Sequence, residues 1–151
     1  MKRLLKILVV LIVVVLFSYS LLKIFQGGGD VGQGSVPSGD TIEVPALSGT
    51  IKVKDFTENP LSQTVDILTL AETADYKIVY FKADQSFLIN LFSQPLLEAR
   101  DEAQKVFLEK LGIETAEACR LNITVAVPYD ISPEFSGRNL GLGFCLQGEE
   151  L

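Results

Sequence analysis

The 151-residue chain contains no histidine and no tryptophan, and its 19 acidic and 13 basic residues give a formal net charge of −6. Without histidine, catalytic arrangements of the Ser-His-Asp and Cys-His types are excluded. The acidic balance argues against a nucleic-acid partner, because affinity for a phosphate backbone comes mainly from lysine and arginine.

The beginning of the chain predicts a membrane anchor. Leu4–Phe25 is an almost unbroken apolar run of 22 residues, and a helix of that length reaches roughly 33 Å, enough to cross a bilayer core. Lys2, Arg3 and Lys6 lie before Ile7, where the unbroken apolar part begins, and no acidic residue does, so the positive-inside rule places the N-terminus in the cytoplasm. Lys23 lies close enough to the far end to snorkel to the headgroups. We therefore expect residues 1–26 to be a basic tip and a single-pass signal anchor in the cell membrane.

A cleaved signal peptide is the alternative interpretation of the same segment. Ser18-Tyr19-Ser20 offers small residues two positions apart after a short apolar stretch, as a cleavage site requires. The apolar character resumes at Leu21 and continues to Phe25, which favours the anchor.

Residues 27–48 have the composition of a flexible linker, with six glycines between positions 27 and 40. Beyond residue 26 the chain keeps all 19 acidic residues and only nine of the basic ones, a formal net charge of −10. This charge suits a solvated exterior domain and argues against docking onto anionic headgroups. We expect the folded extracytoplasmic domain to comprise residues 49–151.

Alternating and β-branched apolar patterns predict six strands in this domain. Lys82–Gln85 is a plausible turn between two of them, which makes that pair the best hairpin in the chain. The expected strands are residues 50–56, 65–70, 76–81, 87–92, 121–127 and 140–146.

One main helix is predicted for residues 94–111, between the fourth and fifth strands. Pro95 suits a first helical position, and a broad apolar stripe from Leu96 to Leu111 recurs at helical spacing. Gly112 is placed to end the helix. The order of elements predicts an α+β fold, a two-layer domain in which a mainly antiparallel sheet is covered by this helix.

Cys119 and Cys145 are the only two cysteines, and an even pair outside the cytoplasm predicts a structural disulfide. Two buried thiols or a metal-binding pair are the alternatives. Two cysteines without histidine make a poor metal site, because structural zinc takes four soft or imidazole ligands. The nearby glycines of residues 137–143 lack the spacing of a phosphate-binding loop, so we interpret them as a turn followed by small residues that allow close backbone approach.

About half of the chain resembles short single-pass membrane-anchored proteins of candidate-phylum bacteria. The similar parts are Tyr76–Tyr80, Phe87–Ile89, Leu108–Ile113, Cys119 and Gly141–Cys145. The resemblance implies a bacterial protein that faces the cell envelope, and it implies no activity.

No residue pattern predicts a catalytic residue, a cofactor or a metal ion. The sequence therefore favours a membrane-tethered, non-catalytic extracytoplasmic module that binds a protein partner or helps to assemble an envelope complex, using open sheet edges that could accept a strand. The alternative is a carboxylate-based hydrolase of cell-wall material, because two acidic residues can meet in a fold as glycosidases require.

Overall fold

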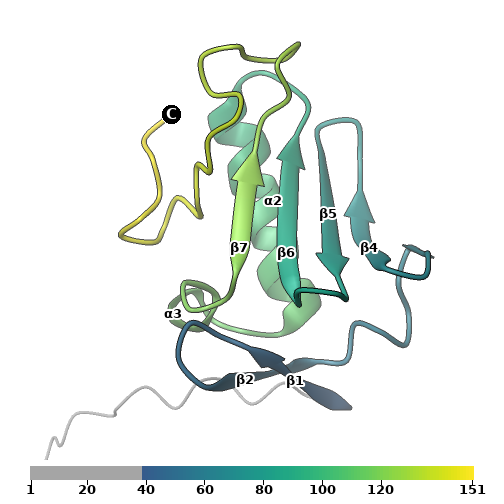
Figure 1. Ribbon diagram of the computed structural model, residues 1–151. Coiled ribbons are helices and arrows are strands. Elements are labelled where there is room, and N and C mark those ends of the chain that lie inside the picture. Colours follow the sequence, from purple (N-terminus) through teal and green to yellow (C-terminus); the bar gives the residue numbers. More distant parts are fainter. Residues whose placement is uncertain (1–38) are drawn as a thin grey trace, which may run out of the picture. The chain divides into compact units, whose positions relative to one another are not determined.

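The computed structural model describes residues 39–151, so the predicted anchor and the first part of the predicted linker lie outside the described residues. The strands form two sheets, one of two strands and one of five, and the main helix α2 lies against one face of the larger sheet (Figure 1). Within residues 39–151, no helix is long and apolar enough to cross a membrane.

The larger sheet has the strand order β3-β4-β5-β6-β7. Strands β3 to β6 are antiparallel to their neighbours, and β5 and β6 form the predicted hairpin, with Tyr76 opposite Leu91 and Phe81 opposite Ser86. The bounds are Ser62–Gln63 for β3, Ile67–Glu72 for β4, Tyr76–Phe81 for β5, Ser86–Leu91 for β6 and Ile123–Ala126 for β7.

The sheet is mixed, because β7 runs parallel to β6. The chain leaves β6, passes through α2 (Leu96–Leu111) and the short helix α3 (Thr115–Ala118), and returns on the same sheet as β7. A connection of this length through a helix returns the chain to the end of the sheet from which it started, so the second strand is parallel to the first. The expected α+β domain with one main helix is confirmed, and the pairing of β7 refines its mainly antiparallel sheet.

The folded part begins earlier than the expected boundary at residue 49. Thr41–Pro45 forms β1, which pairs antiparallel with β2, Thr50–Lys54. Val44, Ile51 and Val53 from this hairpin are buried in the main hydrophobic core. The last part of the predicted linker is therefore a strand, and its alternating Ile42 and Val44 are the apolar pattern that the linker prediction passed over.

Helix α2 confirms the predicted helix and its end at Leu111, but it begins at Leu96, two residues later than predicted. Pro95 precedes the first helical residue in extended conformation, and no side chain caps this end of the helix. At the other end Gly112 adopts the left-handed conformation, with φ of 63°, and its N–H donates to the carbonyl of Leu108. Glycine adopts this conformation without steric cost, which explains why the helix ends here.

The core between α2 and the sheet contains a chain of aromatic rings. Phe87 lies at its centre, with ring centroids 5.7 Å from Phe56, 4.9 Å from Tyr80 and 5.2 Å from Phe107. Tilted and edge-to-face pairs at these separations add to the hydrophobic stabilisation of buried rings. The cluster joins the segment before β3, strands β5 and β6 and helix α2 into one core.

The predicted last strand, residues 140–146, is wrong. Gly141 has a positive φ of 63°, and the Cys145 N–H donates to the carbonyl of Leu142 in a tight turn. Leu140 and Leu142 are buried, whereas Phe144 and Leu146 are exposed. The alternation of leucines imitates a strand, but positive backbone angles and turns break the extended conformation that a strand needs.

Candidate functional site

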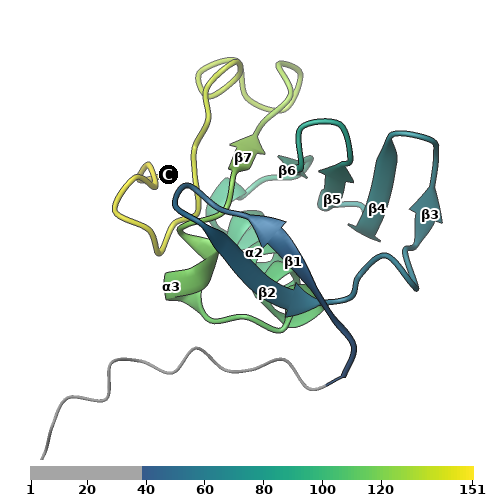
Figure 2. The same cartoon turned by 60° about the horizontal axis from the view of Figure 1, so that its bottom comes forward.

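One face of the five-stranded sheet is covered by α2, and the other face is not covered by any helix or strand of the described part of the chain (Figure 1, Figure 2). We call this second surface the open face. Because side chains alternate along a strand, the registers identify its members. They are Ile67, Thr69, Glu72, Lys77, Val79, Phe81, Ser86, Leu88, Asn90, Thr124 and Ala126.

The open face is unusually apolar for a surface that should meet water. Ile67, Phe81, Leu88 and Ala126 lie on it and are half-buried, and Val79 between them is 7% exposed. None of the five belongs to the core cluster formed by the described residues. Antiparallel sheets with one solvated face normally place polar residues on that face. Half-buried apolar residues that are gathered on one uncovered face of a sheet indicate an interaction site.

Charge is nearly absent from the open face, although the chain beyond residue 26 carries a net charge of −10. The two charged members, Lys77 and Glu72, form an ion pair with 2.9 Å between Nζ and Oε2. Between this pair and the hairpin turn, Thr69, Val79 and Leu88 occupy neighbouring positions on adjacent strands. The open face is therefore a nearly neutral surface on an acidic domain.

One edge of the same sheet is only partly paired. Strand β3 is two residues long and pairs with Leu68 and Thr69, so on the side away from β5 residues 70–72 of β4 have no neighbouring strand among the described residues. A depression of about 440 Å³ lies there, between Pro60–Leu61 and Leu70–Thr73. Pro60 has no N–H to donate, which helps to explain why β3 does not continue along β4. We call this region the β4 edge (Figure 2).

The opposite edge of the sheet is closed by the C-terminal segment, residues 139–151. The N–H of Leu140 donates to the carbonyl of Val125. The Asn139 amide completes the pairing, because its Oδ1 accepts from the N–H of Val125 at 2.9 Å and its Nδ2 donates to the carbonyl of Ile123 at 3.2 Å. A side-chain amide thus takes the place of a strand's backbone, and β7 is no longer an open edge.

Two polar side chains of α2 hold the C-terminal segment from the other side. The Gln104 Oε1 accepts a hydrogen bond from the Gly143 N–H, and the Arg100 Nη1 donates to the carbonyl of Glu149 at 2.6 Å. A Cβ added to Gly143 would lie 2.9 Å from the Arg100 Nη2. The close backbone approach that the sequence predicts for these glycines is therefore confirmed at Gly143.

Sequence reasoning missed Arg100 and Gln104, although both are buried. They are four residues apart and lie beside the apolar stripe of α2, a position that looks like the solvated flank of an amphipathic helix. The glycine at position 143 is the only sequence signal for them, because it leaves room for a large neighbour.

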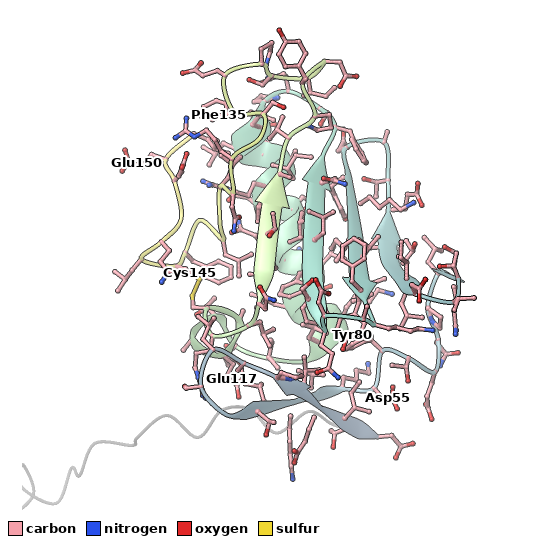
Figure 3. The ribbon with its side chains drawn as sticks, in the orientation of Figure 1. Asp55, Tyr80, Glu117, Phe135, Cys145 and Glu150 are labelled. Carbon is pink, nitrogen blue, oxygen red and sulfur yellow. A yellow bond between two sulfur atoms is a disulfide. The ribbon has the colours of Figure 1, made fainter. Side chains whose placement is uncertain are left out.

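Cys119 and Cys145 lie at disulfide distance, with 5.6 Å between their Cα atoms. Cys119 follows α3 directly, and Cys145 lies on the C-terminal segment beside that helix (Figure 3). On the chain-entropy model, closing a loop with a sequence separation of 26 stabilises the fold by about 3.5 kcal/mol. The predicted pair is therefore brought together, and it joins α3 to the C-terminal segment.

Carboxylates gather at one further place, near the start of α2. A depression of about 320 Å³ is lined by Asp75, Glu98 and Glu102, together with Pro95. Burial, followed by the negative charges of Glu102 and Asp75, raises the pKa of the neighbouring Tyr76 above its ordinary value of 10.0. No group of three or more His, Cys, Asp or Glu side chains within residues 39–151 is placed to hold a metal ion.

No family model, curated protein or solved structure matches this chain. The choice of the open face and the β4 edge as the candidate site therefore rests on the geometry described above.

Proposed function

We propose that the chain is a membrane-tethered, non-catalytic binding or assembly module of the cell envelope, and that it binds a protein partner through the open face and the β4 edge. The observation that carries this proposal is the apolar, nearly neutral open face of an otherwise acidic domain. A face of this kind is stabilised when a second protein surface removes it from water.

The β4 edge supports the same proposal in a second way. Its unpaired residues 70–72 can form main-chain hydrogen bonds with an extended segment of the partner, as in other strand-addition complexes. Leu61 and Val65, which are 61% and 86% exposed, flank the short β3 and offer apolar contacts to such a segment. A partner that adds a strand here would extend over the adjoining open face.

The tether and the location are part of the proposal. The apolar run of residues 4–25, with basic residues in front of it, supports a single-pass anchor whose N-terminus is cytoplasmic and whose folded domain lies outside the cell membrane. The intact mass of the membrane-extracted protein tests this arrangement. A mass that lacks about the first 20 residues would show cleavage and would overturn the tether.

Site-specific photo-cross-linking in intact cells of the native host tests the binding surface. A photoreactive phenylalanine analogue replaces Phe81 on the open face, or Glu102 on α2 as the matched control. We expect a protein adduct from position 81 and none from position 102, and we expect Leu88→Asp to abolish the adduct because it adds a charge to the apolar face. Equal adducts from both positions, or none from position 81, would contradict the proposal.

A carboxylate-based cell-wall hydrolase is the second candidate, and the acidic depression near Pro95 favours it. Asp75, Glu98 and Glu102 line one concave site, and two carboxyl groups across such a site are the minimum for glycosidase chemistry. Release of soluble fragments from purified cell walls by the full chain is the assay. Asp75→Asn, Glu98→Gln and Glu102→Gln should each be tested, and unchanged release with all three would end this candidate.

A further inference from the structure

The C-terminal segment consists of two parts that are held very differently. Residues 139–142 are fixed to β7 by the Asn139 amide and by the burial of Leu140 and Leu142. Residues 143–149, which we call the lid, include the exposed Gly143, Phe144, Leu146 and Gln147. The lid crosses the flank of α2 and contributes little apolar surface to the core.

Beneath the lid lies a buried cation without a carboxylate partner. Arg100 is only 4% exposed, and no acidic group of the described residues lies within ion-pair distance of it. Its Nη1 donates to the carbonyl of Glu149, and its Nε finds no acceptor among the described residues. The Glu149 carboxylate pairs with Arg138 instead. Burying a charged group without an opposite charge costs free energy. The buried Arg100 therefore favours a conformation in which its guanidinium reaches water.

Burial also affects the pKa of this side chain. Removal from water lowers the pKa of Arg100, and the nearby Asp101 offsets this only in part. The closed lid therefore keeps the Arg100 guanidinium away from water. Four polar contacts hold the lid in place: Arg100 to the Glu149 carbonyl, the Gly143 N–H to Gln104, the Glu149 N–H to the Leu140 carbonyl, and the Glu149 carboxylate to Arg138.

The Cys119–Cys145 bond is the covalent link that holds the lid over Arg100. It joins the lid to the end of α3, and residues 139–142 have their own attachment to β7. Both cysteines are partly exposed, and both line a depression of about 230 Å³ at the surface. A small dithiol can reach this depression from solvent.

We propose that residues 143–149 form a redox-controlled lid, which is closed while Cys119 and Cys145 are bonded and opens when a dithiol reduces them. In the reducing step the two thiols of the dithiol are oxidised to a disulfide. Two electrons and two protons pass to the Cys119–Cys145 bond, which breaks to give two thiols. Water then reaches the Arg100 guanidinium, while Leu140 and Leu142 stay in the core.

Hydrogen exchange of the full chain, followed by mass spectrometry, tests the lid. The oxidised protein is compared with protein reduced by dithiothreitol. We expect the lid amides of Gly143 and Glu149 to exchange at least about tenfold faster after reduction, since their hydrogen bonds to Gln104 and Leu140 depend on closure. Peptides from β5 and β6 should keep their protection, which also shows that the domain remains folded.

Arg100→Met tests whether the buried charge of Arg100 makes the lid open once the disulfide is reduced. It removes the buried charge and keeps a side chain of similar length, so the lid of the reduced variant should stay closed and exchange more slowly than that of the reduced parent protein. The proposal is overturned if reduction leaves lid exchange unchanged, if it accelerates β5 and β6 equally, or if Arg100→Met gives no slower exchange after reduction.

Discussion

Replacing Asn139 with alanine tests how the edge of β7 is closed. The change removes three hydrogen bonds, to the N–H of Val125, the N–H of Gly141 and the carbonyl of Ile123. Val125 is fully buried, and leaving its N–H without a partner costs about 1–3 kcal/mol. The other two groups are at the exposed side of the segment and can regain hydrogen bonds to water, so each adds about 0.5 kcal/mol. The expected loss of unfolding free energy is therefore about 2–4 kcal/mol.

The assay is urea-induced unfolding of the full chain, followed by far-UV circular dichroism. Asn122→Ala is the matched control, because Asn122 is an exposed asparagine near the same strand and makes no side-chain hydrogen bond within the described residues. It should change stability by less than about 0.5 kcal/mol. Asn139→Asp should fall between the two, since a carboxylate keeps both acceptor roles and loses the donor. If Asn139→Ala and Asn122→Ala have the same effect, the amide does not close the edge and the reasoning fails.

Three further predictions concern the core, the helix end and pH. Phe107→Ala leaves a cavity in the aromatic cluster and should cost about 3–5 kcal/mol in the same urea assay; a loss below about 1 kcal/mol would contradict the packing. Gly112→Ala should cost about 1 kcal/mol, because a Cβ disfavours the left-handed conformation at this position, and an unchanged urea midpoint would refute that role. Burial raises the pKa of Tyr76 and Tyr80 above 10.0, so the stability that these neutral phenols contribute should be lost as the pH rises beyond about 10. Replacing both tyrosines with phenylalanine should flatten the fall of unfolding free energy with pH, and an equally steep fall would count against the assignment.

Local sequence patterns predict the elements whose pattern and environment agree. Helix α2 and the β5–β6 hairpin are identified from their periodicity and from Gly112, because each buries the face that its apolar residues define. The segment from Leu140 to Leu146 has an equally regular alternation, yet it forms turns. Its conformation is decided by tertiary contacts with Asn139, Arg100 and the disulfide, and periodicity carries no information about those contacts.

The candidate site was less accessible to sequence reasoning than the fold. The hydrophobic character of Val79 and Leu88 fits a strand that is buried on both faces as well as one that is buried on a single face. Only the pairing of the strands shows that a single helix serves the sheet and that these two residues lie on its other side. Arg100 was hidden for the opposite reason, because a charged residue on a helix is usually solvated.

The closed edge at β7 also limits how copies of this domain could associate. Head-to-tail growth of a continuous sheet needs two complementary edges on each copy, and here one of the two is sealed within the molecule by Asn139 and Leu140. When two copies pair through their β4 edges, neither copy keeps an open edge in this sheet, so the assembly stops at a dimer. An exposed strand edge is ordinarily a hazard for fibre formation. In the five-stranded sheet of the described residues, the single open edge permits pairing of two copies, and the sealed edge prevents continuous growth of that sheet.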